Sequence, residues 1–411
     1  MSAVTLPEAE LRSRLRAFVD DHLIPAEPEL NRLDASWHRS PLLHDLQAKA
    51  KAEGLWALGH PAEIGGGGLD FLPYARLNET IGRSDWGQRV FGTATLQDAL
   101  MLQRFANPEL RDRWLPPLVA GEIHPSVGLT EPDVAGSDPR LMQTSAVRDG
   151  DDWIISGRKW FTTHANRAAF TTVFCRTGGT ADTPEFSAIL VPTDTPGYTV
   201  VRVLETMGKT SGGHSEILLD GVRVPHENVV GETGHGLRIA QARLGPGRIF
   251  HCMRWLGQAE RAFELMCERA QTRFAHGSLL ADKGEVQRHI AESAIELQSA
   301  RLLVLDAARV LDTGAKARVE ISMAKVAAAH MFHNVVDRAI QVFGAAGVTS
   351  DLPLDRMYRE ARFGRILDGA DEVHRMVISR HLLRDYDGQA PWMQSLDART
   401  GHLDETKENL P

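Results

Sequence analysis

The sequence is poor in cysteine and has no long hydrophobic run. Its 411 residues contain three cysteines, Cys175, Cys252 and Cys267, and their spacing matches no metal-binding pattern. A small, odd number of cysteines is typical of a reducing compartment rather than of a secreted protein built on disulfides. No apolar run approaches the roughly 20 residues that a membrane-spanning helix needs, so insertion into a membrane is not expected.

An excess of basic residues is also lacking. The formal net charge is −8 at pH 7, whereas a nucleic-acid or anionic-membrane surface would need a basic stripe. The chain is 43% hydrophobic and 24% charged, which is ordinary for a globular protein, and its length suits two or three domains. Residues 2–23 are amphipathic but contain four acids, which suits neither a secretory signal nor a transit peptide. We therefore expect a cytoplasmic protein without nucleic-acid partners.

Several motifs that carry chemistry in other proteins are missing. There is no Gly-x-Ser-x-Gly elbow, and the glycine run at 65–68 lacks the preceding strand and following Gly-Lys-Ser/Thr of a phosphate loop. His330 and His333 share a helix face, but no third ligand is evident, so no metal site is expected. The reactive groups must be sought elsewhere.

Hydrophobic periodicity changes twice along the chain. Helical spacing up to about residue 119 gives way to short, β-branched or alternating runs from about 126 to 231. Long helical patterns return from residue 236, with one stripe at Ile290, Ala294, Leu297, Ala300, Val304, Ala307 and Leu311. We predict an N-terminal helical domain (1–125), a middle antiparallel β domain (126–232), a C-terminal helical bundle (233–388) and a polar tail (389–411).

The turn at 128–138, Gly-Leu-Thr-Glu-Pro-Asp-Val-Ala-Gly-Ser-Asp, is the most informative segment. Its main-chain N–H groups, with the hydroxyls of Thr130 and Ser137, can hold a flat polar ring and a phosphate. Alone, such a run is more often an exposed turn, in which Glu131, Asp133 and Asp138 cap or bridge. However, Trp-Phe-Thr-Thr at 160–163 lies one hairpin further on, and two hydroxyl-rich turns with this spacing suit opposite edges of one ring.

These turns, and the order of helices, sheet and helical bundle, resemble the acyl-CoA dehydrogenase family over nearly the whole chain. The resemblance implies an α+β, mostly α fold with an N-terminal helical domain, a middle antiparallel β domain and a C-terminal four-helix bundle. It also implies FAD as cofactor, an acyl-CoA thioester as substrate and an electron-transferring flavoprotein as electron acceptor. The family assembles as homodimers or homotetramers in which subunits share FAD sites. Chain length, branching and hydroxylation of the acyl group are not readable from the sequence.

A carboxylate near the C-terminus matches the catalytic base of this family. An isolated Asp before a helix is usually an N-cap, but Asp368, in Ile-Leu-Asp-Gly-Ala-Asp-Glu-Val-His at 366–374, stands in the catalytic slot, where glutamate is more usual. Burial beside a flavin and an acyl chain would raise the pKa of such a carboxyl toward the working pH. By resemblance, the backbone N–H of Asp368 and a flavin hydroxyl hold the thioester oxygen. The Asp side chain is one methylene shorter than that of Glu, so its carboxylate reaches about 1.5 Å less far.

One branch of the family explains the aspartate. Its members, fused in some animals to aminoglycoside-phosphotransferase-like domains, use Asp as the base. They share the extra Val134, the Gly-Gly-His-Ser-Glu run at 212–216 and the Arg-Leu-Gly-Pro-Gly-Arg run at 243–248. We expect the Gly-Pro-Gly-Arg part of the last run to form a turn.

The resemblance assigns further residues to cofactor and substrate. Leu129 and Thr130 bond the pyrimidine side of the flavin, Phe161 lies against the ring and Thr163 approaches N5. The residues assigned to a neighbouring subunit's FAD are Arg273, for the pyrophosphate, and Gln341, Gly344 and Ala345, for the adenosine part. The residues assigned to the acyl-CoA are Ser137, Arg248 and Gly369.

Three positions depart from the family pattern, and two other functions stay open. His276 replaces a usual Phe, Ala370 a usual Thr and Glu372 a usual Gln; we keep Ala370 and Glu372 as cofactor contacts. A flavin oxidase that resembles nitroalkane oxidases would also use an Asp base and would release peroxide. A non-catalytic flavin-fold protein, associated with DNA or acting as a scaffold, would show no turnover of any acyl-CoA.

Overall fold

The computed structural model describes residues 6–33, 37–180, 182–207 and 213–384. The chain divides into two compact units: unit 1 is Met1–Leu69 with Trp86–Gly247, and unit 2 is Asp70–Asp85 with Arg248–Pro411. The predicted tail at 389–411, the end of the predicted bundle domain at 385–388, and Gly212 lie outside the described residues. The boundaries of the four segments drawn from the sequence remain a prediction.

Unit 1 begins with helices whose ends follow from local sequence. Leu11, Leu15 and Phe18, which share one helix face, are buried on the first of them. Asn107 is the N-cap of another helix, which begins at Pro108; its side chain accepts a hydrogen bond from the N–H of Leu110 at 2.9 Å. The helices are α1 (Glu8–Phe18), α2 (Ile24–Leu30), α3 (Pro41–Ala52), α5 (Gly87–Val90), α6 (Leu96–Phe105) and α7 (Pro108–Ala120).

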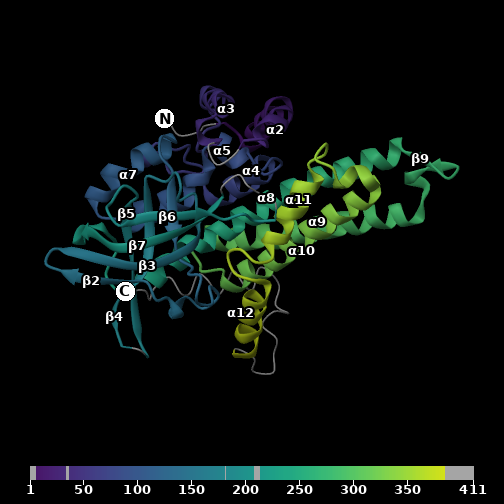
Figure 1. Cartoon of the computed structure of the whole chain (residues 1–411). Helices are drawn as coiled ribbons and strands as arrows, with labels where there is room; N and C mark the ends of the chain where they lie inside the picture. The colour runs from purple at the N-terminus through teal and green to yellow at the C-terminus, as the bar shows by residue number, and fades with distance from the viewer. Residues whose placement is uncertain (1–5, 34–36, 181, 208–212, 385–411) are drawn as a thin grey trace. The chain divides into compact units, whose positions relative to one another are not determined.

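The second part of unit 1 is a mixed sheet (Figure 1). Its strands are β1 (Pro125–Gly128), β2 (Ser145–Asp149), β3 (Asp152–Thr163), β4 (Phe170–Gly179), β5 (Pro184–Pro192), β6 (Tyr198–Val203), β7 (His214–Pro225) and β8 (Val229–Val230). The strand order is β6-β7-β3-β2-β4-β5-β8, with β1 beside β4. Most pairs are antiparallel, as predicted, but β1 and β2 each pair with β4 in parallel. A parallel pair needs a long crossover, which the chain between β1 and β4 supplies.

The Gly-Pro-Gly-Arg run is helical, so the expectation of a turn is wrong. It lies inside α8 (Gly236–Thr272), which accommodates Pro246. Composition favours a turn because proline removes a helix hydrogen bond, but packing against α6 opposes it. Arg243 forms an ion pair with Asp98 at 2.9 Å, and a Cβ on Gly247 would lie 2.3 Å from Gln97. These non-local contacts hold this part of α8 in place.

Unit 2 is built from helices. They are α4 (Phe71–Ile81), the remainder of α8, α9 (Gly284–Asp312), α10 (Arg318–Phe343), α11 (Leu354–Gly364) and α12 (Asp371–Arg384), and a short hairpin, β9 (Phe274–Ala275) and β10 (Ser278–Leu279), joins α8 to α9. Helices α9 and α10 lie side by side (Figure 1). The predicted stripe on α9 buries Leu297, Ala300, Val304 and Ala307, although Ala294 is exposed.

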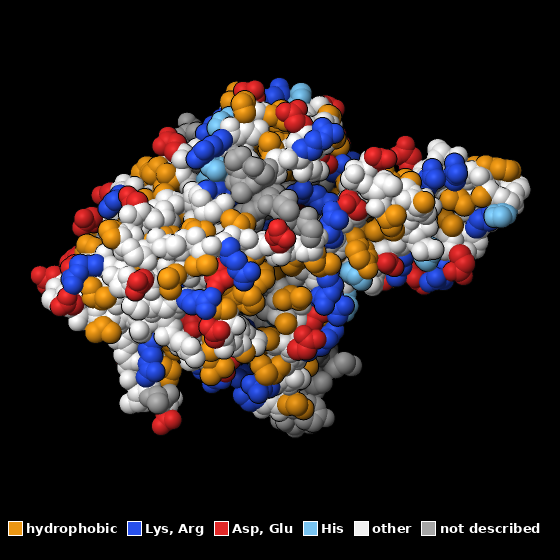
Figure 2. Space-filling model, viewed as in Figure 1, with side chains coloured by type: hydrophobic (Ala, Val, Ile, Leu, Met, Phe, Trp, Pro, Cys, Tyr) orange, Lys and Arg blue, Asp and Glu red, His pale blue; other side chains and the backbone are white. Residues whose placement is uncertain are grey.

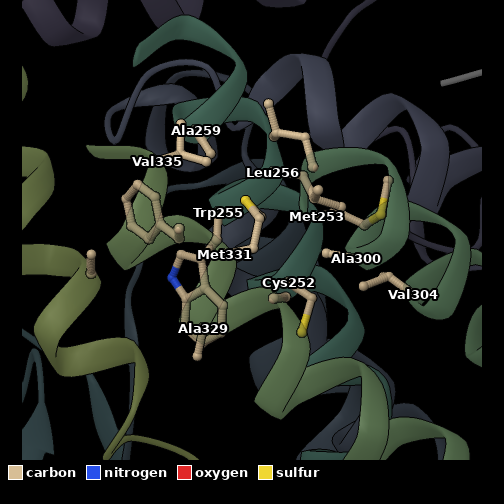
Figure 3. Close-up of a cluster of buried hydrophobic side chains, with 14 of the residues drawn as sticks. Cys252, Met253, Trp255, Leu256, Ala259, Ala300, Val304, Ala329, Met331 and Val335 are labelled. Atoms are coloured by element: carbon tan, nitrogen blue, oxygen red, sulfur yellow. The ribbon is translucent and has the colours of Figure 1, made fainter. Parts of the chain in front are cut away.

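The core of unit 2 is made where α8, α9 and α10 meet. Met253 and Leu256 from α8 lie near Ala300 and Val304 from α9 and Met331 from α10 (Figure 3). These side chains are nearly or completely buried. Small residues between the larger ones allow the helices to approach closely, so the core depends on their volumes as well as on their hydrophobicity.

Helix α4 packs into unit 2, although its sequence lies among the N-terminal helices. Asn78 is fully buried and donates a hydrogen bond to the carbonyl of Phe250 at 3.0 Å. At the crossing with α8, a Cβ on Gly82 would lie 2.3 Å from Cα of Arg254, and one on Gly257 would lie 2.1 Å from the carbonyl oxygen of Glu79. The two glycines therefore allow backbone contact between α4 and α8.

The surface carries charges of both signs. On the face drawn in Figure 2, Lys and Arg side chains are interspersed with Asp and Glu. Among the described residues, no helix combines the length and the hydropathy that a membrane crossing requires.

The α4–α8 crossing predicts the effect of one methyl group. Gly257→Ala should lower the free energy of unfolding by about 1–3 kcal/mol, because the added Cβ overlaps the Glu79 carbonyl. Gly284→Ala is the matched control, since a Cβ at that helical position meets no atom within 4 Å. Urea denaturation of the two variants measures the difference. Equal midpoints would contradict the close contact.

Candidate active site

The loop between α11 and α12 has an unusual backbone conformation at Asp368 and Gly369. Their φ angles are +53° and +106°, a region that Asp tolerates better than most residues and that Gly adopts without penalty. A Cβ at position 369 would lie 2.8 Å from Nε2 of His374, so glycine is required there for space as well. Because α12 begins only at Asp371, Asp368 is not its N-cap.

Cationic side chains hold the carbonyl groups of this loop. Arg248 donates from Nε to the carbonyl oxygen of Asp368 at 2.7 Å, and Nε2 of His374 lies 3.3 Å from the same oxygen. Lys325 donates to the carbonyl oxygen of Gly369 at 2.6 Å. The peptide planes on both sides of Gly369 are therefore fixed, and the first of them begins at Asp368, which restricts where its side chain starts.

A buried carboxylate, Asp371, holds the loop's surroundings in place. It accepts hydrogen bonds from Nε of Arg365 and from Nε2 of His330, each at 2.9 Å, and lies 3.8 Å from Nζ of Lys325. Burial alone would raise the pKa of Asp371, but these cationic partners outweigh it and the pKa is lowered. His330 thus pairs with Asp371, while the ring of His333 lies 5.1 Å from that of Tyr358.

The carboxylate of Asp368 is partly accessible, with 24% of its side chain exposed, and its Oδ2 lies 3.4 Å from Nε2 of His251. Burial lowers the pKa of both Arg248 and Lys325, an effect that neighbouring carboxylates oppose. Burial, and then repulsion by Arg248 and Lys325, lower the pKa of His374 to about 4. His374, at the carbonyl of Asp368, is therefore neutral near pH 7.

In unit 1, the two predicted hydroxyl-rich turns contact each other directly. Thr130 donates its hydroxyl proton to the carbonyl of Trp160 at 2.7 Å, and the N–H of Trp160 donates to the carbonyl of Thr130 at 3.0 Å. The Thr130 oxygen keeps lone pairs that can accept a further hydrogen bond. The sequence interpretation that these turns act together at one place is compatible with this contact.

Phe161 is an exposed aromatic residue in a strained backbone. Its φ is +51°, it lies at an irregularity in the β3–β7 pairing, and its side chain is 40% exposed. Its ring centroid is 5.4 Å from that of His214, whose Nδ1 lies 3.0 Å from the Thr163 hydroxyl. A bulky residue in this conformation costs free energy, which makes the position a candidate for function.

A buried ion pair supports the first turn. Lys159, fully buried on β3, donates to Glu131 at 2.7 Å and to the carbonyl of Leu129 at 3.1 Å. Glu131 also accepts from the N–H groups of Gln143 and Thr144. Burial would raise the pKa of Glu131, but Lys159 and these donors outweigh it and the pKa is lowered. Glu131 therefore bridges, as predicted, and Asp138 caps by accepting from the N–H of Arg140.

The remaining predicted residues lie in three places. Ser137 is exposed in the first turn, while Ala370 and Glu372 flank the start of α12, where Glu372 is exposed. The residues predicted for a neighbour's FAD are exposed at the ends of α8 and α10: Arg273, Gln341, Gly344 and Ala345. Arg269 lies over the ring of Phe343 at 5.3 Å, which brings these two helix ends together. His276, also exposed, has a φ of +50°.

Several groups that shape the site were not predicted from the sequence. Lys159, Lys325, His251 and Arg254 were not singled out, and Asp371 entered only as part of a motif. A signal was present for the two lysines, because each interrupts an otherwise apolar pattern: Lys159 on a strand and Lys325 among the alanines of α10. A lysine at a core position needs an anionic or carbonyl partner. Its partner is distant in sequence, so the pattern alone does not reveal it.

Family models of the acyl-CoA dehydrogenases match most of the chain. The N-terminal domain model matches residues 7–122, the middle domain model 126–222 and the C-terminal domain model 234–383. A relative from Mycobacterium tuberculosis, the probable acyl-CoA dehydrogenase FadE2, is 42% identical, covering 92% of this chain and 96% of its own. Mouse acyl-CoA dehydrogenase family member 10 is 40% identical over 92% of this chain, which spans only 37% of that longer protein.

Solved structures agree with these matches. A candidate acyl-CoA dehydrogenase from Mycobacterium abscessus superposes with a TM-score of 0.88 at 38% identity, covering 94% of this chain and all of the other. A glutaryl-CoA dehydrogenase from Mycobacterium smegmatis, solved in complex with FADH2, has a TM-score of 0.81 at 25% identity and covers 95% and 96% of the two chains.

The buried pair beneath the first turn predicts a coupling between two substitutions. Lys159→Met leaves the Glu131 carboxylate buried without its cation and should lower the free energy of unfolding by about 3–5 kcal/mol. Adding Glu131→Gln removes the second charge and should recover part of that loss. Urea denaturation of both single variants and the double variant measures the coupling, and strictly additive losses would contradict it. Because the folded pKa of Glu131 is lowered, its contribution should disappear as the pH falls below about 4.5.

Proposed function

Since this chain belongs to the acyl-CoA dehydrogenase family, we propose that it oxidises an acyl-CoA thioester to the trans-2-enoyl thioester, with FAD as cofactor and Asp368 as the base. The observation that carries the proposal is the Asp368–Gly369 loop. Its backbone has positive φ at both residues, its carbonyls are held by Arg248 and Lys325, and its carboxylate is left partly accessible. A base that must meet one carbon atom needs this kind of fixed origin.

The residues of unit 1 fit the cofactor. Phe161 presents an exposed aromatic surface beside the Thr163 hydroxyl, and the Thr130 oxygen retains acceptor capacity in the adjoining turn. An aromatic surface flanked by hydroxyl and main-chain groups suits a flat ring with polar edges. We assign Leu129, Thr130, Phe161 and Thr163 to this ring. When bound, FAD accepts the hydride from the β carbon of the acyl group.

The proton step belongs to this chain's own residues. Asp368 removes the proton from the carbon next to the thioester carbonyl, and the electron pair of that C–H bond becomes the new double bond as the hydride leaves. The backbone N–H of Asp368 stabilises the charge that develops on the thioester oxygen. Because the Asp side chain is one methylene shorter than that of Glu, the position of its Cα decides whether the carboxylate reaches the substrate carbon. The hydrogen bonds to the loop carbonyls fix that position. We assign Ser137, Arg248 and Gly369 to the thioester and its CoA arm.

We further propose that the active form is a homo-oligomer with shared FAD sites. Arg248 and Arg273 are 25 positions apart at opposite ends of one helical stretch, about 37 Å. Arg273 is therefore too far from Arg248, and from the Asp368 loop that Arg248 holds, to contact an FAD whose flavin lies at that loop in the same chain. The exposed set at Arg273, Gln341, Gly344 and Ala345 therefore serves a neighbour's cofactor. An electron-transferring flavoprotein is the proposed acceptor of the electrons from the reduced flavin. We also propose that this chain belongs to the branch of the family whose members in some animals are fused to kinase-like domains.

The base assignment predicts the phenotype of Asp368→Asn. Asn has the same shape and also tolerates positive φ, so the variant should fold and retain FAD. It cannot accept the substrate proton, so anaerobic flavin reduction should slow by about 100- to 10,000-fold. Stopped-flow absorbance with butyryl-, octanoyl- and palmitoyl-CoA tests this, using whichever thioester reduces the wild-type flavin. Asp337→Asn, on the exposed side of α10, is the control.

A wild-type rate of flavin reduction in Asp368→Asn would refute the base assignment. Steady peroxide release by the wild-type protein when a nitroalkane is supplied, without flavin reduction by any acyl-CoA, would instead favour the flavin oxidase. A bound flavin that neither a thioester nor an oxidase substrate reduces, together with retention on DNA, would favour the non-catalytic protein.

The shared site predicts a loss of cofactor at an exposed position. Arg273→Ala should weaken FAD binding by about tenfold or more, because it removes a charged hydrogen bond to the pyrophosphate of the FAD bound by the neighbouring subunit. Arg288→Ala is the control, since Arg288 is an exposed arginine paired with Glu285 and Glu292 on α9. FAD titration by fluorescence, with light scattering for the oligomeric state, measures the effect. Equal affinity in the two variants would contradict the shared site.

A further inference from the structure

Three basic side chains follow one another along α8 at the Asp368 loop. Arg248, His251 and Arg254 are spaced by three residues, so successive members are neighbours on the helix surface. Arg248 donates to the backbone carbonyl of Asp368 at 2.7 Å. Nε2 of His251 lies 3.4 Å from Oδ2 of the Asp368 carboxylate. Nη2 of Arg254 lies 2.9 Å from Nδ1 of His251. The first residue thus contacts the loop backbone, the second the carboxylate and the third the imidazole.

The contact with Arg254 determines which ring nitrogen of His251 carries the proton. A guanidinium has only N–H donors and no acceptor. Nδ1 of His251 must therefore present its lone pair to Arg254, and it cannot carry a proton at the same time. A neutral imidazole has one N–H group, which is then on Nε2, the atom that faces Asp368. Protonation of both nitrogens would set two N–H groups against each other at the Arg254 contact.

We propose that His251 is a positioning residue for the base: its Nε2–H holds one oxygen of the Asp368 carboxylate, and Arg254 sets the tautomer that makes this possible. This inference rests on the proposed role of Asp368. The distance of 3.4 Å exceeds the roughly 3.2 Å upper range of ordinary N–H···O hydrogen bonds, but catalytic hydrogen bonds are often long without substrate and shorten when it is bound.

The other charged groups near Asp368 have partners other than its carboxylate. Lys325 and Arg248 donate to backbone carbonyls of the loop, and Asp371 pairs with Arg365 and His330. His374 lies at the Asp368 carbonyl and not at its carboxylate. Arg254 is itself held among acidic groups, since Asp85, Asp368 and Glu360 oppose the effect of burial on its pKa. The carboxylate therefore meets a neutral donor that it can keep while its other oxygen takes the substrate proton.

Such a donor matters more for Asp than for Glu. The shorter side chain has fewer positions from which it can reach the substrate, so a rotation about one bond removes it from the reaction. A hydrogen bond to one carboxylate oxygen prevents that rotation and also favours the ionised, basic form. Without it, Asp368 should be both less well placed and more readily protonated.

The test compares His251→Leu with His251→Gln in the FAD-loaded protein. Leucine removes the donor, whereas glutamine places an amide N–H near the position of Nε2. The rate of anaerobic flavin reduction is measured from pH 5 to 9 with the acyl-CoA that reduces the wild-type flavin. His251→Leu should lower the rate at pH 7 by about tenfold and move the acidic side of the profile upward by about one pH unit. His251→Gln should restore most of the rate and the wild-type profile.

A wild-type profile in His251→Leu would overturn the inference, as would a glutamine variant as slow as the leucine variant. Persistence of the wild-type rate in Asp368→Asn would instead overturn the proposed function, so the two failures are distinguishable. A second measurement needs no variant: the ¹⁵N chemical shifts of His251 in the resting holoenzyme should report a protonated Nε2 and an unprotonated Nδ1. The opposite tautomer would refute the proposal even if the leucine variant failed to fold.

Discussion

The buried carboxylate of Asp371 is the interaction on which the geometry of the Asp368 loop depends. Asp371 stands at the start of α12 and contacts Arg365, just after α11, and Lys325 and His330 on α10. Lys325 extends the connection to the carbonyl of Gly369. Removing one member of such a network would leave buried charges without partners, which costs more than each hydrogen bond contributes separately. The loop is thus held from several helices at once.

The same arrangement occurs in unit 1 with different residues. There, Phe161 has a positive φ close to that of Asp368, and the buried pair of Lys159 and Glu131 lies two positions away along β3. In both units a residue in a strained conformation stands beside a buried ionic group that ties it to a distant segment. Strain of this kind persists only where the surroundings determine the backbone independently. Phe161 is proposed to meet the cofactor, and Asp368 is proposed to meet the substrate.

This arrangement bears on the use of aspartate as the base. An aspartate side chain extends less far toward the substrate than a glutamate side chain and has fewer rotatable bonds. Its backbone therefore has to be placed more accurately. The hydrogen bonds from Arg248 and Lys325 to the loop carbonyls supply that accuracy. His251, beside the carboxylate, restricts the remaining rotation of the Asp368 side chain. Arg248 and Lys325 contact the carbonyl groups of the loop, and Arg254 contacts His251, rather than the carboxylate itself.

The sequence by itself determined those features that depend on local periodicity and local composition. The apolar stripes of α1 and α9, the change from helical to strand patterns near residue 126 and the hydroxyl-rich turns at Thr130 and Thr163 were readable because each involves neighbours in the chain. Only the tertiary structure decided where α4 packs, that Pro246 lies within a helix, and which acids meet Lys159 and Lys325. Those outcomes depend on contacts between residues tens to hundreds of positions apart. Such contacts override local preference and leave no periodic trace in the sequence.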